Sequence, residues 1–179
     1  AEYLKTNSPS GVRRVLVIIS DGEDTNSTGV IKAIFEAERK ITGNIQGEKL
    51  RELRVKARDG AKLAEQTRVL RSLQDADTVF YSINPAGSSY QLNSMSVFGQ
   101  ENMQRFAEQT GGSAFLPKFQ PIDTKEPYSN DINKRKNESL LNGIFNQLAN
   151  ELRSQYLIQY YADENQTKGS FVKLSVEMP

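Results

Sequence analysis

A short, uninterrupted run of apolar residues near the start of the chain constrains the fold more than any other feature. The run covers residues 15–19 and is rich in β-branched side chains, which favour a strand. Because successive positions are all apolar, we expect both faces of this strand to be buried, as in a parallel sheet covered by helices. The run ends abruptly at the polar pair Ser20 and Asp21.

Two further apolar runs, at residues 78–83 and 113–116, predict two more strands. Segments with helical spacing of apolar residues precede and follow them, and the clearest covers 141–152. Residues 84–99 and 117–137 are rich in polar residues, proline and glycine, and predict loops. This order of elements predicts an α/β fold with a Rossmann-like parallel sheet, in which right-handed crossovers place helices on both faces.

The last part of the chain and one internal segment have a different character. Residues 156–161 and 171–178 predict an antiparallel hairpin, since apolar and polar positions alternate in the second of them. Residues 40–75 carry many interleaved acidic and basic side chains and predict a charged helical insertion with ion pairs along its solvated face. We therefore expect a single domain over 1–179 that contains this insertion and a C-terminal hairpin at about 156–178.

Composition excludes several classes of function. The chain has 179 residues with no His and no Cys, which excludes Ser-His-Asp hydrolases, Cys-His proteases, and zinc sites built from these ligands. Lys and Arg number 23 against 22 Asp and Glu, so the net charge of +1 argues against a protein that coats nucleic acid. No apolar stretch has the length of about 18 residues that a membrane span requires.

The polar turn after the first strand is the most informative candidate site. Open parallel sheets bind ligands at the carboxyl ends of their strands, and Asp21 is the first polar side chain that can leave the sheet there. Oxygen-bearing side chains without His or Cys suit a hard cation such as Mg²⁺ or Ca²⁺. Helix capping is an alternative role for the later residues of the turn. The candidate residues are Ser20, Asp21, Gly22, Glu23, Asp24 and Thr25.

The motif in residues 15–24, a hydrophobic strand followed by Ser-Asp-Gly, resembles the fourth strand of von Willebrand factor type A (vWA) domains. Residues 79–83 resemble the fifth strand, and 106–115, with Thr-Gly-Gly, resemble the passage into the sixth. Residues 144–161 are similar to the last helix and tail of a bacterial subgroup that is secreted, periplasmic or attached to the cell envelope. The resemblance implies a non-enzymatic adhesion module with Asp21 in its metal-ion-dependent adhesion site (MIDAS). It also implies that the module binds a protein ligand through Ser20, Asp21, Gly22, Glu23, Asp24 and Thr25.

One departure from this family pattern is important for the metal. The family site also uses an upstream Asp-x-Ser-x-Ser loop, and this chain contains no such motif. We therefore expect the chain to be the C-terminal part of such a domain, without the first strands, and to bind divalent ions weakly or not at all. Mg²⁺ or Ca²⁺ binding is expected only in a longer parent. Missing strands would leave an open sheet edge, which predicts a homodimer or a strand swap.

Two alternatives remain open. Asp21, Glu23 and Thr25 follow a strand with the spacing that haloacid-dehalogenase-like phosphatases use, in which the first Asp is the nucleophile and Mg²⁺ screens the phosphate. Glu23 departs from the second Asp of that pattern. The other alternative is a purely structural domain of an envelope protein.

Overall fold

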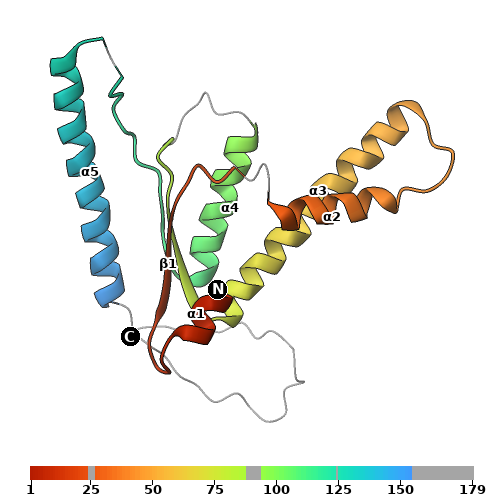
Figure 1. Cartoon of the computed structure of the whole chain (residues 1–179), viewed down its shortest axis with the longest axis horizontal. Coiled ribbons are helices and arrows are strands. Elements are labelled where there is room, and N and C mark those ends of the chain that lie inside the picture. The colour runs from red at the N-terminus through yellow and green to blue at the C-terminus, as the bar shows by residue number, and fades with distance from the viewer. Residues whose placement is uncertain (24–26, 88–93, 124, 155–179) are drawn as a thin grey trace, which may run out of the picture.

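The computed structural model describes residues 1–23, 27–87, 94–123 and 125–154 (Figure 1). The predicted hairpin at 156–178 lies outside the described residues, as do Asp24 and Thr25. Strands and long helices alternate along the chain, which is the predicted α/β pattern. The elements in chain order are α1 (Glu2–Asn7), β1 (Arg14–Ile19), α2 (Thr28–Arg39), α3 (Gly47–Asp75), β2 (Thr78–Ile83), α4 (Ser94–Thr110), β3 (Ala114–Phe115) and α5 (Pro127–Ser154).

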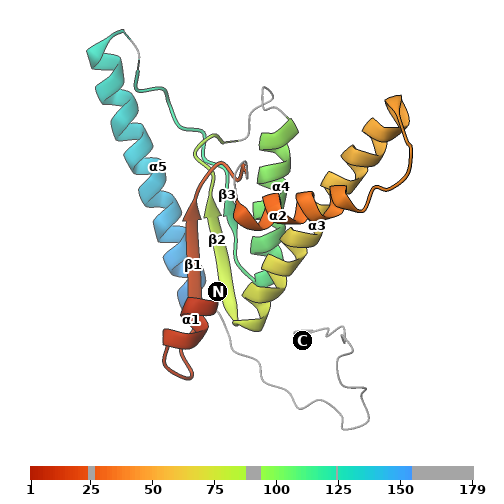
Figure 2. The same ribbon diagram turned by 45° about the vertical axis from the view of Figure 1, so that its right-hand side comes forward.

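The described strands form one parallel sheet in the order β1-β2-β3, which confirms the predicted mixed α/β architecture with a Rossmann-like parallel sheet. In the register of the first pair, Leu16 lies beside Phe80 and Ile19 beside Ile83. Helices α3 and α4 lie on one side of the sheet and α5 lies on the other, as both ribbon views show (Figures 1 and 2). The sheet is therefore the middle layer of three.

The hydrophobic core lies between the sheet and the helices α3 and α4. Leu16 and Ile18 of β1 pack against a buried cluster, and Phe80 of β2 is 3% exposed within it. Phe80 and Phe106 meet edge to face, with ring centroids 5.7 Å apart, which is a favourable arrangement for aromatic rings. The buried members of the cluster are Leu70, Leu73, Phe80, Met103, Phe106 and Ala107.

The Thr-Gly-Gly sequence at the end of α4 joins this helix to the sheet. The Thr110 hydroxyl accepts a hydrogen bond from the Phe80 N–H at 2.9 Å and donates one to the Phe106 carbonyl at 2.7 Å. Gly112 lies directly against the Phe80 carbonyl, where a Cβ atom would have no room. The N–H of Gly112 closes the helix by donating to the Ala107 carbonyl at 2.9 Å. A larger residue at position 112 would push α4 away from β2.

One prediction about β1 is wrong: neither face of the strand is fully buried, and only the face of Leu16 and Ile18 packs against the core cluster. Val17 is 40% exposed and Ile19 60% exposed, although the apolar run predicts burial on both sides. The reason is the position of the strand, because β1 has a described neighbour only in β2 and lies at the sheet edge. The apolar run predicts side chains that are more stable when buried. Among the described residues, the core covers only Leu16 and Ile18 in part.

Both predicted loops are partly wrong. The segment 84–99 becomes helical at Ser94, and the segment 117–137 becomes helical at Pro127. Proline suits the first turn of a helix, where its missing N–H would have no partner, so Pro127 is compatible with a helix start. The predicted charged helical segment forms one helix of 29 residues from Gly47 to Asp75.

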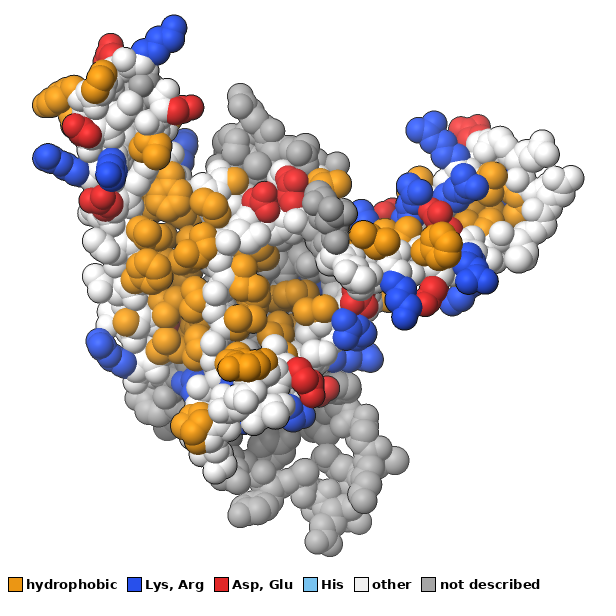
Figure 3. Space-filling model, in the orientation of Figure 1, with side chains coloured by type: hydrophobic (Ala, Val, Ile, Leu, Met, Phe, Trp, Pro, Cys, Tyr) orange, Lys and Arg blue, Asp and Glu red, His pale blue; other side chains and the backbone are white. Residues whose placement is uncertain are grey.

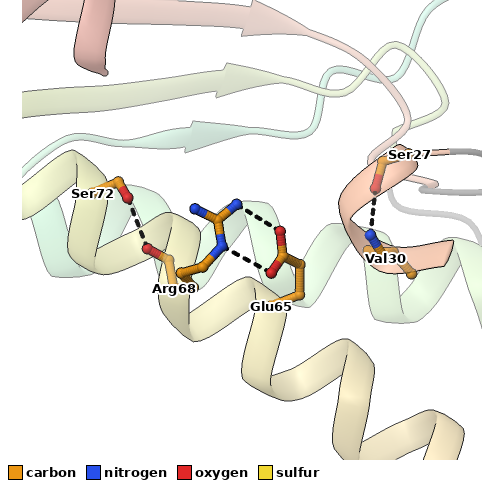
Figure 4. A network of polar contacts seen from close by, with 5 residues as sticks. All are labelled: Ser27, Val30, Glu65, Arg68 and Ser72. Carbon is orange, nitrogen blue, oxygen red and sulfur yellow. Dashed lines mark hydrogen bonds and ion pairs between the residues drawn. The ribbon is translucent and has the colours of Figure 1, made fainter. Parts of the chain in front are cut away.

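Helices α2 and α3 pack against each other as an arm that extends from the sheet (Figure 1). The Ser27 hydroxyl caps α2 by accepting from the Val30 N–H at 3.2 Å (Figure 4). Glu65 of α3 lies against Gly29 in the first turn of α2, where the helix dipole favours a negative charge. Glu65 also accepts two hydrogen bonds from Arg68, and this contact raises the pKa of the Arg68 guanidinium.

Removing the aromatic ring at the centre of the core should destabilise the fold. Phe80→Ala should lower the free energy of unfolding by about 3–5 kcal/mol, because it leaves a cavity beneath Phe106. Phe35→Ala is the matched control, since Phe35 is 64% exposed on α2 and its loss should cost less than about 1 kcal/mol. Urea denaturation measures both. Equal losses for the two variants would contradict this assignment of the core.

Candidate functional site

The carboxylate turn, defined here by the described residues Ser20–Glu23, lies directly beyond the carboxyl end of β1. The sheet pairing continues into it, because the Ser20 N–H donates to the Ile83 carbonyl at 3.1 Å. The turn therefore begins as an extension of the β1–β2 ladder. This position agrees with the location predicted for a ligand site in a parallel sheet.

Hydrogen bonds within the turn hold the Asp21 carboxylate in place. Asp21 Oδ1 accepts from the Glu23 N–H at 3.1 Å, and Ser20 Oγ accepts from the Gly22 N–H at 3.1 Å. Asp21 is itself exposed. Its side chain is thus positioned by the backbone of its own turn while the carboxylate stays open to solvent.

Asn84 fixes the turn to the end of β2. This side chain is 1% exposed and donates from Nδ2 to the Asp21 carbonyl at 3.2 Å. Its Oδ1 accepts from the Ala86 N–H at 2.9 Å, and its own N–H donates to the Phe115 carbonyl at 2.9 Å. One buried amide residue therefore connects the ends of all three strands, and its hydrogen bonds compensate for its burial.

The first turns of α4 form the other wall of the site. Gly22 has a φ of +79° and approaches Gly99 so closely that an added Cβ atom would lie 2.6 Å from the Gly99 carbonyl oxygen. The Ser96 hydroxyl, on the same helix, donates to the Glu23 carboxylate. Two glycines and one hydroxyl therefore allow α4 to pack directly on the carboxylate turn.

The described residues do not form a complete site for a divalent cation. A Ca²⁺ ion takes about 6–8 oxygen ligands, and Mg²⁺ requires an octahedral set. Of the carboxylates in the turn, Asp21 faces solvent, while Glu23 is bound to Ser96. Nowhere in the described ranges do three or more acidic residues gather in a group that could hold a metal ion. In the same ranges, no helix is long and apolar enough to cross a membrane.

The structure brings some of the predicted site residues together and adds others. Ser20, Asp21, Gly22 and Glu23 form one turn, whereas Asp24 and Thr25 lie outside the described residues. The sequence placed Asn84 only at the start of the predicted loop 84–99 and did not assign it a role. The signal was the Asn-Pro pair directly after a strand, since an Asn there often bonds to nearby backbone. Ser96 and Gly99 carried no comparable signal.

Comparison of the chain with protein-family models, with curated proteins and with solved structures returns no significant match.

Gly22 should be intolerant of substitution for two separable reasons. Gly11 is the control for the first, because its φ of +77° is similar and no atom lies within 4 Å of an added Cβ. Gly11→Ala should cost about 1–2 kcal/mol of stability through the left-handed backbone alone. Gly22→Ala should cost about 1–3 kcal/mol more, because the Cβ also displaces Gly99 and α4. Thermal and urea unfolding measure both variants, and equal costs would refute the close contact.

Proposed function

We propose that this chain is part of a vWA-type module that binds a protein ligand through the carboxylate turn and the adjoining end of the sheet. The observation that carries the proposal is the place of Asp21. It is an exposed carboxylate on a hydrogen-bonded turn at the carboxyl end of β1, next to the buried Asn84. A rigid scaffold that presents a fixed polar side chain at this position is suited to recognition.

Three features support the family assignment. The strands run in parallel in sequential order, as the resemblance implies for the fourth to sixth strands of the family. The Ser-Asp-Gly turn follows the first of them, and Thr110 with Gly112 fastens the last described helix before β3 to the sheet. We infer on these grounds that the sheet is vWA-like and lacks the first strands of that family. Secretion or attachment to the cell envelope stays a prediction from the resemblance alone.

The chemistry of the described residues suits binding through charge and hydrogen bonds. The exposed Asp21 carboxylate attracts positive charge, whether that charge belongs to a cation or to a basic group of the partner. Complementary charge accelerates association and excludes partners of the wrong sign. In the family that this chain resembles, an upstream loop supplies further metal ligands. The carboxylate turn is then one part of a larger surface.

The phosphatase alternative has less support in the geometry. Such an enzyme needs its acidic side chains available to the ion that accompanies the phosphate. Glu23, which occupies the second acidic position of that pattern, is instead bound to Ser96 at the start of α4. This contact weighs against the phosphatase alternative.

The central test replaces the exposed carboxylate of Asp21. Asp21→Asn removes the charge but keeps an oxygen that accepts from the Glu23 N–H, so the turn should survive. Binding to the protein ligand should weaken by about tenfold or more, which corresponds to about 1.4 kcal/mol. Asp59→Asn, an exposed change on the arm, should leave affinity unchanged. Surface plasmon resonance measures both, and equal affinity for the wild type and Asp21→Asn would overturn the proposal.

The present chain should bind divalent ions weakly. Titration calorimetry with Mg²⁺ and with Ca²⁺ should give no heat attributable to a site with a dissociation constant below about 1 mM, because the described turn offers too few oxygen ligands. Asp21→Asn should give the same trace as the wild type. A micromolar site that disappears in Asp21→Asn would show that this chain alone completes the coordination.

A further inference from the structure

Strand β1 offers an open edge to another strand. In the parallel ladder, the Ser20 N–H points towards β2, where it binds the Ile83 carbonyl. Backbone direction alternates along a strand, so the N–H and carbonyl groups of Val15, Val17 and Ile19 point away from β2. Within the described residues, no strand lies on that side. Such an edge is a template for one more strand.

The side chains beside this edge are also apolar and accessible. Val17 and Ile19 are on the face opposite the α3–α4 core, the face that α5 partly covers. Phe145 of α5 is 43% exposed. Figure 3 shows apolar side chains gathered over α5 and the adjoining face of the sheet. A strand added at the β1 edge would cover this surface as well as the backbone groups.

The handedness of the fold indicates which strand belongs there. The connections from β1 to β2 and from β2 to β3 place their helices on one face of the sheet. Helix α5 lies on the opposite face, and it runs antiparallel to the strands from its teal to its blue end (Figure 2). Parallel crossovers are right-handed, so a connection on the opposite face leads back across the sheet. The next parallel strand after α5 then falls beyond β1.

The chain provides a suitable segment at the right point. Helix α5 ends at Ser154, at the end of the sheet where β1 begins (Figure 2). Residues 156–161 follow almost at once and consist of three Tyr with Leu, Ile and Gln. These residue types favour strands, and six residues match the length of β1.

We propose that residues 156–161 of the same chain add to the free edge of β1 as a fourth, parallel strand. Placing Ile158 beside Val17 directs Tyr156, Ile158 and Tyr160 to the apolar face shared with α5. We expect the added strand to come from the same chain, because α5 ends near the β1 edge and gives residues 156–161 a high effective concentration there. A strand exchanged with a second copy would use the same edge and is distinguished by the test.

The test is a cysteine cross-link, for which a chain without native Cys is well suited. The double variant Val17→Cys with Ile158→Cys should form an intramolecular disulfide under mild oxidation, because adjacent strands bring the two Cα atoms within about 4.4–6.8 Å. Non-reducing electrophoresis and mass spectrometry should show a cross-linked monomer. The control is Val55→Cys with Ile158→Cys, since Val55 is 51% exposed on the arm and should give no cross-link.

Two outcomes would overturn the proposal. A disulfide-linked dimer at micromolar concentration would show that a second copy of the chain occupies the β1 edge. The absence of any cross-link would show that residues 156–161 do not pair with β1. Hydrogen exchange on the unmodified chain provides a check that does not depend on the variants. The amides of Val15, Val17 and Ile19 should be protected at least tenfold more than in Ile158→Pro, while protection in α4 stays the same. Equal exchange at these amides would also refute the proposal.

Discussion

The structure depends on the pairing of the buried strand β2 with a neighbour on each side. Among the described strands, β2 alone has two partners, and its backbone is shared between β1, β3 and the hydroxyl of Thr110. Its two faces serve different layers, since Phe80 packs into the α3–α4 core while Tyr81 and Ile83 are fully buried on the other side. A buried strand with unsatisfied backbone groups would be costly. The positions of both neighbours and of α4 follow from this requirement.

The same strand controls the candidate site. Asn84 lies at the end of β2. Its side-chain amide donates to the Asp21 carbonyl, and its side-chain oxygen accepts from the Ala86 N–H. The turn that presents the Asp21 carboxylate is therefore tied to the sheet by hydrogen bonds. A preorganised turn does not have to be ordered when the partner binds, so the entropy cost of binding is smaller. The proposed binding function and the stability of the core thus rest on one element.

The open edge of β1 links the proposed function to the proposed strand addition. Asp21 lies at the end of the strand whose outer edge is free, so whatever covers that edge also forms a wall of the candidate surface. Segment 156–161 would do so from the same chain. A strand from a second copy of the chain would compete for the same place. The exposed Val17 and Ile19 are the reason that some partner is needed, because apolar surface next to unpaired backbone is unfavourable in water.

Local sequence was sufficient for the strands and for the position of the polar turn at the end of β1. Residues 15–19 and 78–83 are apolar and β-branched enough to predict strands, and the polar turn at Ser20 marks the sheet end. It was insufficient for the starts of α4 and α5, because these lie in stretches whose polar residues, proline and glycine indicated loops. Contacts across the chain alone decided that β1 lies at the edge of the described sheet, that Asn84 supports Asp21, and that Gly22 meets Gly99. The spacing of apolar residues along the chain predicts which side chains are buried. Which element packs against them depends on contacts between residues that are distant in the sequence.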